Sequence, residues 1–182
     1  TDVLVSTDLL VEGVHFDLTY VPLKHLGYKA AVVNFSDIYA MNGHPRQITV
    51  SLAISKRFTV EHIEELYSGI RLACEIYGVD LVGGDTTSSR GGLVISITCI
   101  GDAPKDRIVY RSGAHDTDLI CVSGDLGSAY MGLQLLEREK VASAGQKDFV
   151  PQFQGKEYLI ERQLKPEARR DIIENLAKAG IM

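Results

Sequence analysis

The sequence lacks the features that mark membrane, secreted and nucleic-acid-binding proteins. None of its apolar runs approaches the roughly 18 residues of a membrane-spanning helix, and no basic stretch precedes an apolar one near residue 1. The three cysteines form no CxxC pair, so we expect neither a zinc site nor disulfides. A formal net charge of −5 is the opposite of a basic nucleic-acid-binding footprint. We therefore predict a cytoplasmic protein with no membrane contact and no nucleic-acid partner.

The motifs of several common active sites are also absent. The sequence contains no GxxxxGK[ST] phosphate loop, no GxGxxG, no HExxH and no GxSxG. Its five histidines show no spacing typical of metal ligands. Any phosphate chemistry must therefore be built from other residues.

What the sequence does contain is an alternation of strand and helix signals. Apolar residues at every second position mark the strongest strand, where Ile48, Val50 and Leu52 share one face. The predicted strands cover residues 4–6, 47–54, 80–82, 93–100 and 118–122. The predicted helices cover residues 28–41, 60–77, 126–139 and 166–179, and Thr59 is the expected N-cap of the second. We expect Cys74, Cys99 and Cys121 to be buried in these elements.

This order of elements predicts an α/β (α+β) fold in which a mixed sheet packs against helices. A break at Arg111-Ser112-Gly113-Ala114 separates a first domain, residues 1–112, from a fresh strand–helix unit, residues 113–182. The last helix is followed only by Ala179 to Met182. We therefore expect the second domain to be incomplete.

Oxygen-bearing side chains stand at the predicted ends of these elements. Ser6-Thr7-Asp8 closes the first strand, Gly83-Gly84-Asp85 follows the strand 80–82, and Asn34 and Asp37 share a face of an otherwise apolar helix. Carboxylate and hydroxyl oxygens are the ligands that Mg²⁺ prefers. Read singly, the Asp8 and Asp85 positions are equally those of turn or cap residues. The residues alone thus leave Mg²⁺ dependence as one of two interpretations.

Four ordered blocks of the sequence resemble the thiamine-monophosphate kinase family, in the superfamily of aminoimidazole ribonucleotide synthetase. The blocks are residues 6–16, Lys29-Ala30 with residues 34–41, residues 83–87 and residues 111–114. The resemblance implies an N-terminal Mg²⁺- and ATP-binding domain that forms a homodimer. It also implies transfer of the γ-phosphoryl group of ATP to thiamine phosphate, which yields thiamine diphosphate and ADP.

The resemblance further implies a role for each matching residue. The implied Mg²⁺ ligands are Ser6, Thr7, Asp8, Asp37 and Asp85. The implied ATP contacts are Tyr67, Gly84, Asp85 and Arg111, and the implied substrate contact is His15. No catalytic base is implied, because a phosphate monoester is largely dianionic at pH 7 and direct in-line transfer needs only charge neutralisation and alignment.

Other interpretations of the same residues remain open. His15 on a solvent-facing loop, Arg111 in a structural ion pair and Tyr67 in the core would each need no ligand. The family's upstream metal-binding Asp and downstream Ser-Asp-Gly segment have no counterpart here, so we expect weak or no kinase activity from these 182 residues alone. The alternatives are another ATP-using enzyme of the superfamily, of the aminoimidazole ribonucleotide synthetase, selenophosphate synthetase or hydrogenase-maturation type, and a non-catalytic dimerising fragment.

Overall fold

The computed structural model describes residues 1–146 and 150–181, and its strands form one mixed sheet. The strands are β1 (Asp2–Val11), β2 (His44–Ile54), β3 (Asp80–Ser88) and β4 (Val94–Ala103), in the order β1-β4-β2-β3. β4 runs antiparallel to both of its neighbours, whereas β2 and β3 are parallel. The predicted mixed sheet is therefore confirmed, with a parallel pair at one edge.

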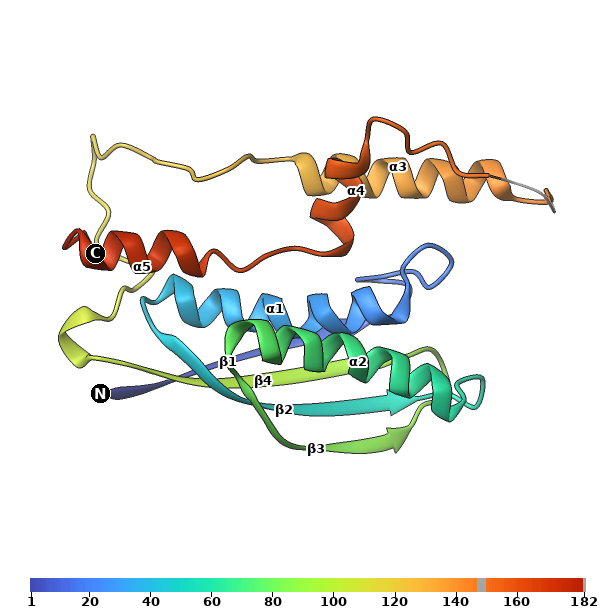
Figure 1. Cartoon of the computed structure of the whole chain (residues 1–182), viewed down its shortest axis with the longest axis horizontal. Coiled ribbons are helices and arrows are strands. Elements are labelled where there is room, and N and C mark those ends of the chain that lie inside the picture. Colours follow the sequence, from blue (N-terminus) through green and yellow to red (C-terminus); the bar gives the residue numbers. More distant parts are fainter. Residues whose placement is uncertain (147–149, 182) are drawn as a thin grey trace.

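One face of this sheet is covered and the other is open. Along β4, Ile95, Ile97 and Cys99 are fully buried while the residues between them are half-buried. On β2 the predicted apolar face is also buried, with Ile48 and Val50 fully inaccessible. Figure 1 shows α1 (Leu23–Ala40) and α2 (Val60–Tyr77) on the covered face, and within the described residues no helix lies on the opposite one. The alternation of apolar and other residues along each strand thus determines which side chains contact the helices.

The two covering helices begin and end at identifiable residues. α2 starts after Thr59 as predicted, where Thr59 and His62 form a reciprocal capping box, and it stops at Gly78 in the left-handed conformation. α1 begins at Leu23, earlier than the predicted residue 28, because Pro22 supplies a fixed φ of −62° at the helix entrance.

The backbones of α1 and α2 touch at two glycines that face each other's helix. A Cβ atom on Gly27 would lie 2.0 Å from the carbonyl oxygen of Leu66, and one on Gly69 would lie 1.9 Å from that of Lys24. Because no side chain fits between the helices at these points, α1 is held at a fixed depth between α2 and the sheet.

The remaining elements form a layer on the far side of α1 (Figure 1). They are α3 (Ser128–Ser143), α4 (Glu157–Leu164) and α5 (Arg170–Lys178), whereas the short η1 (Lys105–Arg107) follows directly after β4. Tyr28 and Tyr77 each donate a hydrogen bond to the Glu167 carboxylate, at 2.9 and 2.7 Å, and so join this layer to α1 and α2. In the part of the chain that is described, no helix has the length and apolar character needed to cross a membrane.

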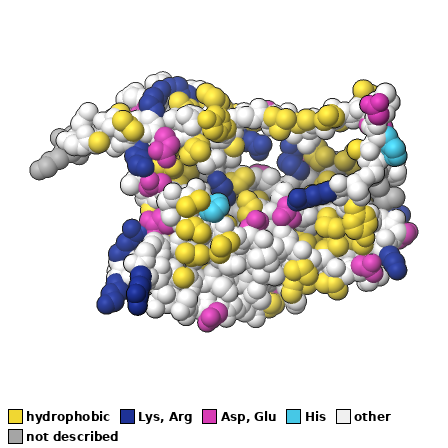
Figure 2. Space-filling view, turned by 180° about the vertical axis from the view of Figure 1, so that it is seen from behind, with side chains coloured by type: hydrophobic (Ala, Val, Ile, Leu, Met, Phe, Trp, Pro, Cys, Tyr) yellow, Lys and Arg dark blue, Asp and Glu magenta, His cyan; other side chains and the backbone are white. Residues whose placement is uncertain are grey.

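The extended segment that leads into α3 (Figure 1) corrects two predictions. Residues 118–122, predicted as a strand, are irregular, and Leu119 and Ile120 are 91% and 93% exposed. Figure 2 shows hydrophobic side chains along this extended segment at the top of the molecule. A strand requires a partner, and none of the described strands lies beside it. Cys121 is therefore exposed rather than buried, whereas Cys74 and Cys99 are buried as expected.

The glycine contact between α1 and α2 generates a stability prediction. Gly69→Ala would gain about 0.5–1 kcal/mol in an ordinary helix interior. Here the new methyl group meets the Lys24 carbonyl and forces the helices apart, so we expect a loss of about 2 kcal/mol or more in the free energy of unfolding. Urea denaturation measures this change in the free energy of unfolding, with Ser68→Ala as the control at the neighbouring position. A Gly69→Ala variant that is more stable than the wild type would contradict the close contact between α1 and α2.

Candidate functional site

The Ser6-Thr7-Asp8 segment lies in the middle of β1 rather than at its end. β1 pairs with β4 along its whole length, from Asp2 opposite Ala103 to Val11 opposite Val94. Successive side chains of a strand point to opposite faces, so Thr7 is separated from Ser6 and Asp8. Its hydroxyl lies 2.9 Å from that of Thr98 in an exposed contact, while Ser6 faces α1.

Ser6, Asp8 and Asp37 form the oxygen cluster on the covered side of β1. The Ser6 hydroxyl donates a 2.8 Å hydrogen bond to Oδ2 of Asp37 on α1. Burial raises the pKa of Asp8, the negative charge of Asp37 raises it further, and His15 acts in the opposite direction. The two carboxylates thus feel each other's charge. Two carboxylates that repel each other, with a hydroxyl beside one of them, form a donor set that suits a hard cation.

Asn34, one turn before Asp37 on α1, carries an unsatisfied polar atom. Its side chain is fully buried, and its amide donates a 3.0 Å hydrogen bond to the Ala30 carbonyl. Its Oδ1 atom has no hydrogen-bond partner among the described residues. An unpaired buried oxygen costs about 1–3 kcal/mol. The shared helical face with Asp37 was visible in the sequence, but the unpaired oxygen was not.

The Gly83-Gly84-Asp85 segment is likewise inside a strand, not after one. Gly84 pairs with Val50 on β2, and a Cβ atom on Gly84 would lie 1.8 Å from the Val50 carbonyl oxygen. Only glycine permits this approach. Tyr67 from α2 lines an open pocket of about 530 Å³ together with Gly84 and Asp85. Three residues predicted to contact a nucleotide therefore meet at the β3 edge of the sheet.

This edge is distant from the Ser6–Asp37 cluster. β4 and β2 lie between β1 and β3, which places the two edge strands about 14 Å apart at the usual strand spacing. Within residues 1–146 and 150–181, no group of three or more His, Cys, Asp or Glu side chains is placed to hold one ion. The structure thus divides the predicted metal ligands into Ser6, Asp8 and Asp37 on the covered face, Thr7 on the open face, and Asp85 at the edge.

Arg111 shares a pocket with the oxygen cluster. The pocket, of about 340 Å³, is lined by Ser6 and Asp37 on one side and by Tyr110 and Arg111 on the other. Its remaining walls are apolar side chains of β1, α1 and residue 109. Tyr110 is 63% exposed, and the sequence analysis assigned it no role. A guanidinium and metal-type oxygens around one cavity are the groups that neutralise phosphates.

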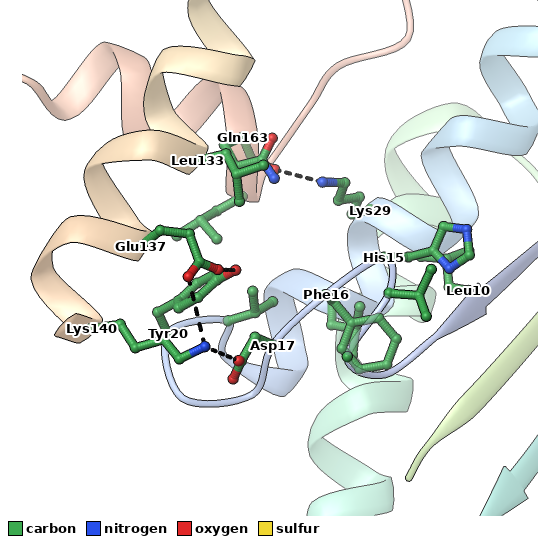
Figure 3. Close-up of a pocket in the computed structure, with 15 residues that line it drawn as sticks. Leu10, His15, Phe16, Asp17, Tyr20, Lys29, Leu133, Glu137, Lys140 and Gln163 are labelled. Atoms are coloured by element: carbon green, nitrogen blue, oxygen red, sulfur yellow. Dashed lines mark hydrogen bonds and ion pairs between the residues drawn. The ribbon is translucent and has the colours of Figure 1, made fainter. Parts of the chain in front are cut away.

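His15 lies in a third pocket, of about 220 Å³, between the β1–α1 loop and helices α3 and α4 (Figure 3). The backbone N–H of Val11 donates a 3.0 Å hydrogen bond to Nδ1 of His15, which leaves Nε2 free to face a ligand. Lys29 lines the same pocket. The resemblance includes Lys29 in a matching block but gives it no role.

The chain is similar to a known family of proteins. The family model described as AIR synthase related protein, N-terminal domain, matches residues 1–103. A thiamine-monophosphate kinase of Bacillus subtilis is 38% identical over 91% of this chain and 49% of its own length. One of Aquifex aeolicus is 37% identical over 96% of this chain and 53% of its own. The chain therefore spans about half the length of the curated relatives it matches.

Solved structures show the same similarity. A structure of thiamine monophosphate kinase from Aquifex aeolicus superposes with a TM-score of 0.82 at 36% identity, covering 97% of this chain and 56% of that one. A second, described as AaThiL complexed with AMPPCP and TMP, gives the same TM-score and identity and covers 97% and 53%.

The repulsion between Asp8 and Asp37 generates a prediction about the free protein. Asp8→Asn removes a partly buried charge beside a second carboxylate, so we expect the Mg²⁺-free variant to be more stable than the wild type at pH 7. Because the pKa of Asp8 is raised, the penalty is present above that pKa and disappears in acid, where the wild-type carboxyl is protonated. Thermal unfolding measures the difference, with the exposed Asp106→Asn as control; a destabilised Asp8→Asn at pH 7 would refute it.

Proposed function

The chain belongs to the AIR synthase related protein family through its N-terminal domain, and on this premise we propose that it is part of a thiamine-monophosphate kinase. The proposed reaction transfers the γ-phosphoryl group of ATP to thiamine phosphate. The observation that supports the proposal is the pocket lined by Ser6, Asp37 and Arg111, because a hydroxyl, a carboxylate and a guanidinium around one cavity are the groups that an ion and a phosphate would require. The names of the relatives and the AMPPCP and TMP in the second solved structure support it.

The oxygen cluster fits Mg²⁺ in its donor chemistry. Asp37 and Asp8 would hold the ion, and Ser6, already hydrogen-bonded to Asp37, would add its hydroxyl oxygen. Mg²⁺ commonly takes one or two carboxylates and completes its shell with water and phosphate oxygens. When bound, such an ion neutralises the charge of the transferring phosphates. Thr7 and Asp85, which lie elsewhere, enter the proposal as ligands of further ions.

The protein's own residues would do the work of positioning. Arg111 would face the phosphates from across the cluster, and Gly84 would let the nucleotide approach the β3 backbone, with Tyr67 and Asp85 beside it. His15 would contact the acceptor from the third pocket. Since the acceptor phosphate is already an anion, no base is required, and alignment of two anions is the main task.

The same family membership suggests how the chain is divided into domains and where the protein is located. We propose that residues 1–112 are the Mg²⁺- and ATP-binding domain and that residues 113–182 begin a second domain. We also propose a cytoplasmic location, as expected of an enzyme that uses ATP.

We further propose that the open sheet face joins two copies of the chain. Val3, Val5 and Leu9 of β1 are 71%, 64% and 55% exposed on this face. Apolar side chains in a row on an uncovered sheet favour burial against an identical surface across a two-fold axis.

Charge placed on this face tests the dimer. Val5→Glu puts a carboxylate at the centre of the interface, so we expect the dimer to weaken by about a hundredfold or more, by light scattering during size-exclusion chromatography. Val60→Glu, at an equally exposed position on α2, is the matched control. A monomeric wild type, or a dimer that tolerates Val5→Glu, would exclude this interface.

Calorimetric titration with AMPPCP tests the nucleotide site. We expect the wild-type chain to bind AMPPCP only with Mg²⁺ present, and Asp37→Asn to weaken that binding by on the order of tenfold or more, because the ion loses a carboxylate ligand. Asp106→Asn, at an exposed position, should bind like the wild type. Binding that needs no Mg²⁺, or that survives in Asp37→Asn, would contradict the proposed site.

A further inference from the structure

The His15 pocket has two ends of opposite charge, and one charge at each end is not matched by the protein. Figure 3 shows Asp17, Tyr20, Glu137 and Lys140 grouped on one side and Lys29 with His15 on the other. All six side chains line the same cavity. The mechanism proposed above uses only His15 among them.

At the basic end, Lys29 has only a neutral partner among the described residues. Its ammonium group donates one hydrogen bond, of 2.9 Å, to the backbone carbonyl of Gln163 on α4. Within the described residues, no carboxylate forms a salt bridge with it. Burial lowers the pKa of Lys29, as expected for an ammonium removed from water without a counter-charge. Two of its three N–H donors remain available to the cavity.

At the acidic end, two carboxylates share one ammonium. Lys140 lies 2.7 Å from Asp17 and 3.7 Å from Glu137, and Tyr20 also donates to Glu137. The hydrogen bond from Lys140 holds the pKa of Asp17 down to about 2, so this carboxylate is ionised at neutral pH. One negative charge is therefore in excess at this end.

This polarity matches one substrate of the proposed reaction. Thiamine phosphate carries a positive thiazolium ring and, through its hydroxyethyl arm, a phosphate dianion. We infer that the pocket holds thiamine phosphate lengthwise, with the phosphate at Lys29 and the thiazolium ring facing Asp17 and Glu137. This inference rests on the proposed function and adds Lys29 as a substrate-binding residue.

The orientation also directs the phosphate toward the oxygen cluster. Lys29 and Asp37 lie on the same helix, α1, and the charge of His15 acts on Asp8. Of the two ends of the pocket, the basic one therefore contains the residue whose charge reaches Asp8, and Lys29 lies about 12 Å from Asp37 along the axis of α1. A phosphate placed there can meet an ATP γ-phosphate, whereas one at the acidic end would face two like charges.

The test compares two ligands that differ only by the phosphate. We would titrate the chain in Mg²⁺-free buffer with thiamine phosphate and with thiamine. The wild type should bind thiamine phosphate with an affinity on the order of tenfold or more above that for thiamine, because only the phosphate can accept a charge-assisted hydrogen bond from Lys29. Lys29→Met should abolish that preference and leave thiamine binding unchanged. Lys29→Arg should retain it.

The ratio of the two affinities separates ligand binding from a structural role. If Lys29 only joined α1 to α4, Lys29→Met would weaken both ligands equally and keep the ratio. Lys24→Met, an exposed lysine on the same helix, is the matched control. Glu137→Gln should weaken both ligands by the same factor, since both carry the thiazolium ring.

Three results would overturn the inference: an unchanged ratio in Lys29→Met, equal wild-type affinity for the two ligands, or no binding of either. None of them bears on Mg²⁺-dependent AMPPCP binding, which uses a different pocket. Failure of the substrate orientation and failure of the nucleotide site are therefore distinguishable.

Discussion

The arrangement of this protein depends on the backbone contact between α1 and α2. Gly27 and Gly69 bring the helices so close that a single methyl group would collide with a carbonyl oxygen. α1 packs against α2 on one side and against β1, β2 and β4 on the other. This fixes the depth of Asp37, so that Ser6 on β1 reaches it at 2.8 Å. The same helix carries Lys29 into the neighbouring pocket.

Charge distribution then determines what each cavity accepts. Next to α1, Asp8 and Asp37 disfavour each other when no cation is bound, which is an arrangement that a fold maintains at a cost in stability. Among the described residues, the adjoining pocket has an ammonium without a carboxylate partner at one end and an excess carboxylate at the other. The proposed cation-bound nucleotide and zwitterionic acceptor would be complementary to these two sites, which share residues of α1.

The sequence predicted the parts of this structure that have regular periodicity. The alternating face of Ile48 and Val50, the Thr59 cap and the mixed α/β order are all confirmed. Strand ends were predicted less well, because polar residues and glycines weaken the apolar signal although the backbone pairing continues. Thus Ser6-Thr7-Asp8 and Gly83-Gly84-Asp85 lie within strands, not at strand ends.

That difference has consequences for the site. A segment at a strand end can turn all its side chains toward one ion, whereas a segment within a strand sends Thr7 to the face opposite Ser6. Period two over the full β1 would have predicted this separation. Residues 118–122 show the converse case, since a strand-like pattern alone cannot form a strand without a neighbour to pair with. The one hydrogen bond that Lys29 makes among the described residues goes to Gln163 on α4, a helix that was not predicted from the sequence.

The proposed cation site, formed by Ser6, Asp8 and Asp37, can be located directly with a paramagnetic ion. Mn²⁺ can replace Mg²⁺ at oxygen ligands and broadens the NMR signals of nearby nuclei. Substoichiometric Mn²⁺ added to the isotope-labelled chain with AMPPCP should first broaden the backbone amides of residues 6–8 and 34–38. Those of exposed α2 residues such as Glu64 should stay sharp. Broadening confined to β3 around Asp85, with residues 34–38 unaffected, would show that the ion does not bind at Ser6, Asp8 and Asp37.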